Sequence, residues 1–314
     1  SKVIFLIFSV KKDNEAKLIF KKYKVMVKDK EEDKGKMINP YDIWCNHLLQ
    51  RQIVRVIFDP SPNAPENAYN VWNGFDIPED SLTEISLADA NIECQALLQH
   101  IRVIWCKNNE ELYNYTMSWF AFILQKPWIK IGVMLCVKSK EGSGKGIVFD
   151  FMRSILGSKL YAQINSVQQL VGDFNSVLEG KLLINCDEAH WGGDIKTANK
   201  MKGLITEGEV WINEKNRKQY CIKNTTALCL ASNEQRATSA REGDRRHYGL
   251  ELDNKWAGKQ TTPEHRQYFV NISGQKDAKG IKYSRAQAFA KILFKWDLSN
   301  FNVKNPPNTD FIDD

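Results

Sequence analysis

The 314-residue sequence lacks long apolar runs and lacks the cysteine spacing of a zinc site. Its longest apolar runs, such as Val3–Phe8 and Val133–Val137, fall far short of the ~20 residues that a membrane helix needs. The seven cysteines are scattered and form no Cys-x-x-Cys pair. No internal repeat of the solenoid kind is present either. These absences argue against membrane, zinc-ribbon and repeat proteins, and they favour a reducing compartment.

What the sequence does contain is typical of a globular protein with more than one domain. Charged residues make up 26% of the chain, and the net charge of +6 permits a polyanion as partner without identifying one. Between about residues 110 and 255, short apolar runs alternate with amphipathic segments. This alternation predicts an α/β domain with a mainly parallel sheet. The expected strands are Ile129–Val137, Leu182–Cys186, Thr226–Ala231 and Tyr248–Leu252, and the expected helices are Ser86–Lys107, Leu112–Leu124, Ile147–Leu156 (ending at Gly157) and Ser284–Trp296.

We predict three domains from these patterns. Residues 1–108 form an α+β head, with strands at Val3–Phe8 and Lys17–Val27 and a solvated charge run at residues 28–36. Residues 109–255 form the sheet core with helices on both faces, and residues 256–314 form a small, mostly helical tail domain.

A glycine-rich turn with a lysine follows the first predicted strand of the core and precedes an amphipathic helix. In such a turn the backbone N–H groups surround phosphate oxygens, and glycine lets the backbone approach closely. The helix adds its positive N-terminal end, and the lysine places a charge on the β and γ phosphates. We therefore predict a nucleoside triphosphate site at Gly142, Ser143, Gly144, Lys145 and Gly146.

The turn departs from the common pattern G-x-x-x-x-G-K-[ST] at two positions. Ser139 stands at the first glycine, and Gly146 stands where a Ser or Thr hydroxyl would hold Mg²⁺. A purely structural glycine-rich turn is the alternative interpretation. We expect the missing hydroxyl to affect magnesium more than phosphate binding.

Two acids, Asp187 and Glu188, end the next apolar strand, about forty residues after the turn. The end of a parallel strand beside a phosphate loop is where Mg²⁺ is held. Asp187 would bind the metal, directly or through water, and Glu188 would polarise the attacking water. The alternative is a surface turn.

Polar residues also end the following strand and precede the last one. Asn233 follows Thr225–Ala231 and could bond the γ-phosphate or the attacking water, or simply cap the strand. Arg245 and Arg246 precede Tyr248–Leu252. Either arginine could neutralise charge at a neighbouring subunit's phosphates, or bridge Asp244 as a surface pair.

Two alternating segments, Glu209–Asn213 and Gln219–Ile222, enclose a basic turn. They predict a β-hairpin with Lys215, Arg217 and Lys218 at its tip. Projected into a channel, this tip would contact DNA phosphates without reading bases. The alternative is an exposed hairpin whose charges only aid solubility.

In this order the motifs resemble the superfamily 3 helicases, of the type found in phage and large-virus primase-helicases and in the C-terminal helicase regions of phage self-priming polymerases. The matching segments are Gly142–Gly146, Asn185–Glu188, Lys202 with Lys215, Ala231–Asn233 and Asp244–Arg246. Together with upstream stretches from Phe58 to Pro127, these segments cover residues 58–255.

The resemblance implies a P-loop AAA+-like core in a hexameric ring, with ATP and Mg²⁺ bound between subunits. It implies a pore hairpin that tracks single-stranded DNA and a covalently linked primase-polymerase absent from this chain. The expected location is the cytoplasm of an infected host cell. Ser139 and Gly146 depart from the family pattern, and we expect these departures to affect magnesium binding and the turnover rate.

Two other hypotheses remain open. The chain could be a nucleotide-binding ring clamp that hydrolyses little ATP and supports a tethered DNA polymerase, which Gly146 favours. It could also be a kinase of small substrates, although the arginines and the basic hairpin argue against that activity.

Overall fold

The computed structural model describes residues 25–27, 36–38, 42–43, 55–187, 195–233, 244–274 and 284–309. Residues 1–55 with 66–69 form one compact unit, and residues 56–65 with 70–314 form a second. In the first unit, β1 (Val25–Val27) pairs antiparallel with β2 (Lys36–Ile38). The predicted strand Val3–Phe8 and most of the charge run lie outside the described residues. The predicted domain boundaries at residues 108 and 255 stay predictions.

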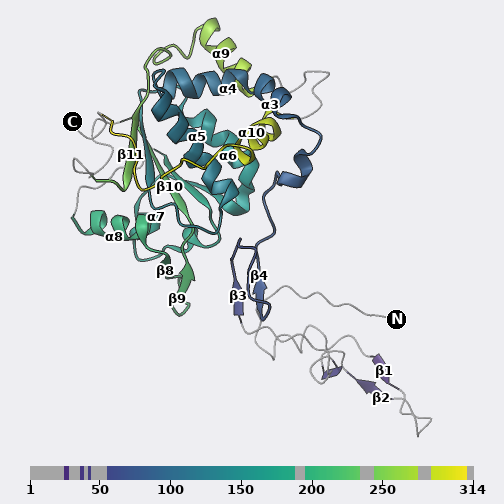
Figure 1. The fold of residues 1–314 in the computed structure, drawn as a ribbon. Coiled ribbons are helices and arrows are strands. Elements are labelled where there is room, and N and C mark those ends of the chain that lie inside the picture. Colours follow the sequence, from purple (N-terminus) through teal and green to yellow (C-terminus); the bar gives the residue numbers. More distant parts are fainter. Residues whose placement is uncertain are drawn as a thin grey trace. The chain divides into compact units, whose positions relative to one another are not determined.

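A five-stranded parallel sheet forms the centre of the second unit (Figure 1). Its spatial order is β11-β5-β10-β7-β6. The predicted mainly parallel sheet is therefore confirmed. The strands are β5 (Met134–Lys138), β6 (Tyr161–Ile164), β7 (Leu183–Asp187), β10 (Ala227–Ser232) and β11 (His247–Glu251).

Two of these strands differ from the prediction. Strand β5 starts at Met134 rather than Ile129, because Gly132 adopts a left-handed φ of 72° just before it and Ile129 is 42% exposed. Strand β6 was not predicted. It follows a helix directly, and among the described strands it pairs only with β7, so its four residues carry little periodic signal.

Side chains on alternate strand positions enter two different cores. Leu135 and Val137 of β5 join the larger core, whereas Met134 and Cys136 join the smaller one on the opposite face. This period of two is what a sheet covered on both faces requires. Helices lie on both sides of the sheet in Figure 1, as predicted.

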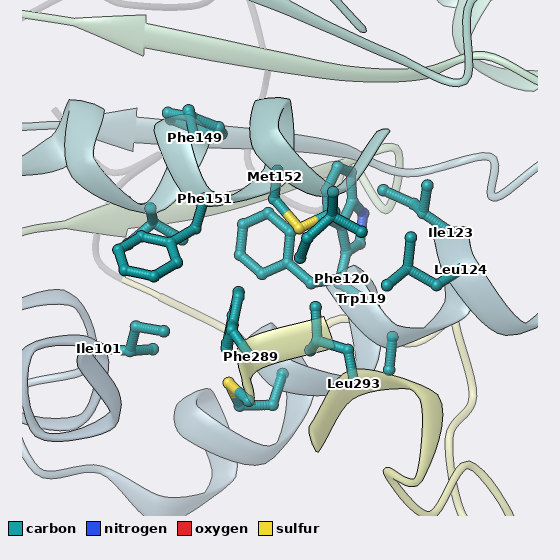
Figure 2. Close-up of a cluster of buried hydrophobic side chains, with 14 of the residues drawn as sticks. Ile101, Trp119, Phe120, Ile123, Leu124, Phe149, Phe151, Met152, Phe289 and Leu293 are labelled. Carbon is teal, nitrogen blue, oxygen red and sulfur yellow. The ribbon is translucent and has the colours of Figure 1, made fainter. Parts of the chain in front are cut away.

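The larger core is formed mainly by helices that come from distant parts of the chain. Figure 2 shows Ile101, Phe120, Met152 and Phe289 converging from four of these helices. The predicted helix over residues 86–107 occurs as three consecutive pieces, interrupted at Cys94. The helical elements are η1 (Glu79–Leu82), α3 (Leu87–Glu93), α4 (Gln95–His100), the π-helix η2 (Ile101–Trp105), α5 (Glu110–Gln125), α6 (Lys145–Leu160, with non-helical Gly157), α9 (Pro263–Ser273) and α10 (Arg285–Phe294).

The smaller core lies under two further helices and an antiparallel hairpin. Met201 and Ile205 of α8 pack there with Ile212 of the hairpin. The hairpin confirms the predicted strand pair. The elements around the smaller core are α7 (Gln168–Val171), η3 (Ser176–Leu178), α8 (Ile195–Thr206), β8 (Glu209–Ile212) and β9 (Tyr220–Lys223). The structure also contains two short strands outside this core, β3 (Arg55–Ile57) and β4 (Ala68–Asn70). Among the described residues, no helix combines the length and apolarity that crossing a membrane requires.

Candidate functional site

Three neighbouring strands end together at the carboxyl edge of the sheet. Strand β10 lies between β5 and β7, with Ser232 opposite Lys138 and Ala231 opposite Asp187. The glycine-rich loop after β5, Asn233 after β10 and Asp187 on β7 therefore reach one edge. Lys145 Nζ donates a hydrogen bond to Asn233 Oδ1 at 2.6 Å. The structure thus brings two of the predicted site residues into direct contact.

The loop between β5 and α6 is fixed by bonds to its surroundings. Its first backbone N–H, at Ser139, donates to Ser232 O at 3.1 Å. The Ser143 hydroxyl donates to Lys140 O at 2.8 Å and is buried. Gly144 precedes α6 with φ 87°, and no side chain caps the helix there. An uncapped helix start is a favourable place for an anion.

Two histidines that the sequence analysis missed hold the carbonyl groups of this loop. His265 Nε2, from α9, bonds Gly142 O at 3.1 Å. His100 Nε2, from α4, bonds Gly144 O at 3.1 Å, and its Nδ1 contacts the Tyr268 hydroxyl at 2.9 Å. Because a carbonyl can only accept, each imidazole donates to the loop. Each histidine stands alone in the sequence, so no motif marks either one.

His100 is neutral at physiological pH. Burial of the ring lowers its pKa from 6.5 to about 4, against an opposing rise from the Gly144 hydrogen bond. The neutral ring that donates from Nε2 accepts at Nδ1, so the Tyr268 hydroxyl is the donor there.

The two loop glycines are required by close contacts as well as by backbone conformation. Both have left-handed φ values, 85° at Gly142 and 87° at Gly144. A Cβ at Gly142 would lie 2.4 Å from Gln260 Nε2, and one at Gly144 would lie 2.5 Å from Phe269 Cε1. By contrast, a Cβ at Gly146 would meet no atom within 4 Å.

A cavity of about 570 Å³ lies beside the loop. It extends from the three loop glycines along the outer face of α6 to α9 and the start of α10. Sequence reasoning did not predict it, because α9 itself was not predicted. Its lining includes Gly146, Asp150, His265, Phe269 and Arg285.

Asp187 lies in a chain of polar contacts. Its Oδ2 accepts from Gln163 Nε2 at 2.9 Å, and Gln163 Oε1 accepts from Arg153. Arg153 in turn pairs with Asp150 at 3.6 Å. Burial and the charge of Asp187 raise the pKa of Asp150, which Arg153 partly opposes. Asp150 is therefore a second carboxylate near Asp187, and the sequence analysis did not single it out.

The predicted metal site is only partly within the described residues. Glu188 lies outside them. The described residues contain no group of three or more His, Cys, Asp or Glu side chains that could hold a metal ion. Magnesium at Asp187 therefore stays a prediction.

The two predicted arginines lie at the opposite edge of the sheet. They precede β11, which starts level with the start of β5 because His247 pairs with Met134. Arg246 bonds Asp244 at 3.2 Å, and Arg245 is exposed. Burial would raise the pKa of Asp244, but bonds from Arg246 and the charge of His247 leave it lowered. Within one chain, neither arginine approaches Lys145.

The basic hairpin also starts from this amino edge, immediately before β10. At its base, Asn224 Nδ2 donates to Leu204 O and Glu207 O, both at 2.9 Å. At its tip, all three predicted cations are exposed, and one of them pairs with a carboxylate at 2.8 Å. The exposed cations are Lys215, Lys218 and Arg217, the last paired with Glu214.

Comparison with known proteins relates the chain to a phage replication protein. Residues 137–246, from β5 to the start of β11, match a family of unknown function, DUF5906. The chain is 29% identical over 177 residues to the DNA primase-polymerase of Nitratiruptor phage NrS-1, covering 54% of this chain and 24% of that protein.

Solved structures of the same phage protein have a similar fold. The apo structure of the NrS-1 C-terminal region (305–718) superposes with a TM-score of 0.56 at 24% identity, covering 69% of this chain and 50% of that one. An A form apo structure of this region gives a TM-score of 0.64 at 20% identity, covering 92% and 68%. The chain spans about a quarter of the length of the curated relative. The predicted resemblance to a phage primase-polymerase is confirmed at this level, and the superfamily 3 type stays a prediction.

Proposed function

We propose that this chain is the ATP-driven helicase or translocase module of a phage replication primase-polymerase. It would act as a hexameric ring on single-stranded DNA, with ATP hydrolysed between subunits. The observation that carries the proposal is the 2.6 Å contact of Lys145 with Asn233, at the edge that Asp187 also reaches. The similarity to the NrS-1 primase-polymerase supports the replication role.

The strand order supports a P-loop AAA+-like core. Strands β6, β7 and β10 lie in succession on one side of β5, and the chain then crosses to β11 on the other side. Parallel α/β sheets bind ligands at the carboxyl ends of strands where the order reverses in this way. The glycine-rich loop follows β5, at this position.

The residues of the site fit a nucleoside triphosphate with magnesium. Ser139 Oγ, at the start of the loop, is buried and has no hydrogen-bond partner in the described part of the chain, as expected for a group that a ligand satisfies. Lys145 would bind the β and γ phosphates, and Asp187 would hold Mg²⁺ directly or through water. The adjoining cavity would receive the nucleoside. Bound magnesium supplies charge neutralisation for phosphoryl transfer.

The chain's other predicted residues have positioning and charge-stabilising roles in this proposal. Glu188 would polarise the attacking water, and Asn233 would orient the γ-phosphate or that water. Arg245 or Arg246 would serve the site of the next subunit. Their position supports such a role, because β5 separates them from their own phosphate loop by roughly 13 Å of strand.

ATPase assays on Lys145→Ala and Glu188→Gln test the mechanism. We expect both variants to lose most of the turnover, whereas Lys140→Ala, an exposed loop lysine, serves as the matched control and keeps it. Wild-type turnover in the first two variants would rule out the mechanism.

A nucleotide-binding ring clamp is the second candidate function, and Gly146 is the observation that favours it. No side chain at this position can supply the hydroxyl that would help to hold magnesium. The clamp predicts nucleotide binding with negligible turnover. Strong magnesium-dependent hydrolysis that single-stranded DNA stimulates would exclude it.

A further inference from the structure

Two aromatic side chains are exposed on two segments of the hairpin region that hydrogen-bond to each other. Trp211 on β8 is 64% exposed, and Phe174, in the loop after α7, is 54% exposed. Among the large hydrophobic side chains that the described residues expose, these two are the aromatic ones. Exposed aromatic rings of this size indicate a binding surface more often than isolated aliphatic side chains do.

The strand register explains why Trp211 points outward. Its neighbours Val210 and Ile212 pack against the smaller core. Side chains alternate along a strand, so Trp211 lies on the other face of the hairpin. Its partner across the hairpin is Cys221, which is also exposed. The outer face of the hairpin therefore presents a tryptophan that the fold leaves uncovered.

The loop that carries Phe174 is attached to β8 by side-chain amides. Asn175 Nδ2 donates to Trp211 O at 2.9 Å, and Asn175 Oδ1 accepts from Asn213 N at 2.8 Å. Asn213 Nδ2 in turn donates to Asp173 O. These bonds fix the backbone on both sides of Phe174 against the strand that carries Trp211.

The charge of the hairpin indicates what covers this surface. Residues 209–223 contain four basic residues and two carboxylates. Two of the basic residues are engaged in ion pairs, Arg217 with Glu214 at 2.8 Å and Lys223 with Asp59 at 3.3 Å. Lys215 and Lys218 remain exposed at the tip. Proteins that bind single strands combine such cations with aromatic rings on which bases stack.

We propose that Trp211, together with Phe174 on the loop bonded to the same strand, forms a base-stacking platform for single-stranded DNA. The platform deepens the proposed function and rests on its DNA-binding part. The hairpin cations attract the phosphates, and unpaired bases stack on the aromatic rings. In a duplex the bases are stacked on one another, so their faces are not available to the rings. The platform accordingly prefers single strands to duplex without reading sequence.

Fluorescence anisotropy with the full chain and no nucleotide tests this platform. The probes are a labelled oligothymidine, the same oligomer with abasic sites throughout, and a duplex of equal length. The variants are Trp211→Ala, Trp211→Phe and Lys215→Ala, with Ile92→Ala as a control, because Ile92 is 72% exposed on a different element, α3.

We expect Trp211→Ala to weaken oligothymidine binding by about 5- to 150-fold, the range for one lost stacking contact. The abasic oligomer should bind the wild type and Trp211→Ala equally, and Trp211→Phe should keep most of the affinity. Lys215→Ala should weaken both oligomers and lower the salt slope by about 0.7, as for one lost phosphate contact. Ile92→Ala should bind like the wild type.

Three outcomes would overturn the platform. In the first, Trp211→Ala binds oligothymidine like the wild type. In the second, it weakens both oligomers equally, which assigns Trp211 a structural role. In the third, it changes the oligomer size in sedimentation without a base-dependent loss, which assigns the surface to a second copy of the chain. If the wild type binds no oligomer, the DNA-binding part of the proposed function fails as well, whereas the ATPase assays above judge the nucleotide site separately.

Discussion

Acidification should destabilise the protein through His100. The ring is 0% exposed and lies between the carbonyl of Gly144 and the hydroxyl of Tyr268. Burial lowers its pKa to about 4, whereas an unfolded chain would protonate it near 6.5. The folded state therefore binds the proton less readily than the unfolded state. Stability from this group is complete above the unfolded pKa and is lost as the pH falls from 6.5 toward 4.

The pKa difference sets the size of the effect. At about pH 5 the unfolded ring is mostly protonated and the folded ring mostly neutral, which costs about 2 kcal/mol of unfolding free energy. Below the folded pKa the loss approaches about 3 kcal/mol. His100→Gln removes the titration and keeps a donor for Gly144 O.

Urea unfolding at about pH 8 and about pH 5 measures the difference. We expect the wild type to lose about 2 kcal/mol more than His100→Gln between these two conditions, because the other titrating groups are common to both proteins. Equal losses in the two proteins would show that the ring titrates in the folded state as it does in the unfolded chain, and would refute the reasoning.

Four further perturbations test other parts of the structure. Gly146→Ser should raise magnesium-dependent turnover in an ATPase assay, because the added side chain enters open space and restores the missing hydroxyl. An unchanged turnover would show that magnesium binding does not depend on this position. Gly144→Ala should lower the thermal midpoint and abolish nucleotide binding, since its Cβ would overlap Phe269; unchanged binding would show that the loop need not keep this conformation. Phe289→Ala, in the core of Figure 2, should cost about 3–5 kcal/mol in denaturant unfolding, and a loss below 1 kcal/mol would contradict its burial. Single-stranded DNA should slow the alkylation of Cys221, because this residue pairs with Trp211 across the hairpin and lies on the same face as the stacking platform. Peptide mass spectrometry measures the alkylation rate, and equal rates with and without DNA would place the strand elsewhere.

The sheet and the hairpin were predictable because their signals are local. The predicted strand Thr226–Ala231 contains the uninterrupted apolar run Ala227–Ala231, which lies in β10, all of whose residues are buried. The alternation around Glu209–Asn213 likewise predicted β8. Helix α9 shows the limit of this reasoning: Ile272 is its buried residue, and Tyr268 and Phe269 are only partly buried against the larger core, so its mostly polar sequence gives a weak apolar pattern. The helix also contacts the loop through His265.

The glycine-rich loop was predictable as a motif, but the residues that hold it were not. His100 and Gly144 are 44 positions apart in sequence, and His265 and Gly142 are 123 apart. Such pairs arise only from the tertiary fold, and the sequence places no motif around either histidine. Asp150 was not predicted for another reason. Exposed carboxylates are common on helices, and only the folded structure shows that this one lies near Asp187.

Strand β10 joins the edge of the sheet that carries the candidate site to the edge that carries the hairpin, and its rigidity has a mechanical consequence. Beyond its carboxyl end, Asn233 contacts Lys145, and just before its amino end Asn224 anchors the hairpin and accepts a bond from Lys130 at 3.1 Å. A buried strand bonded on both sides cannot stretch or bend independently of the sheet. In the proposed translocase, a displacement of Asn233 on phosphate binding would therefore be transmitted along the strand axis to the hairpin. If the proposed function is correct, the coupling between ATP hydrolysis and hairpin movement would depend on the backbone of this one strand.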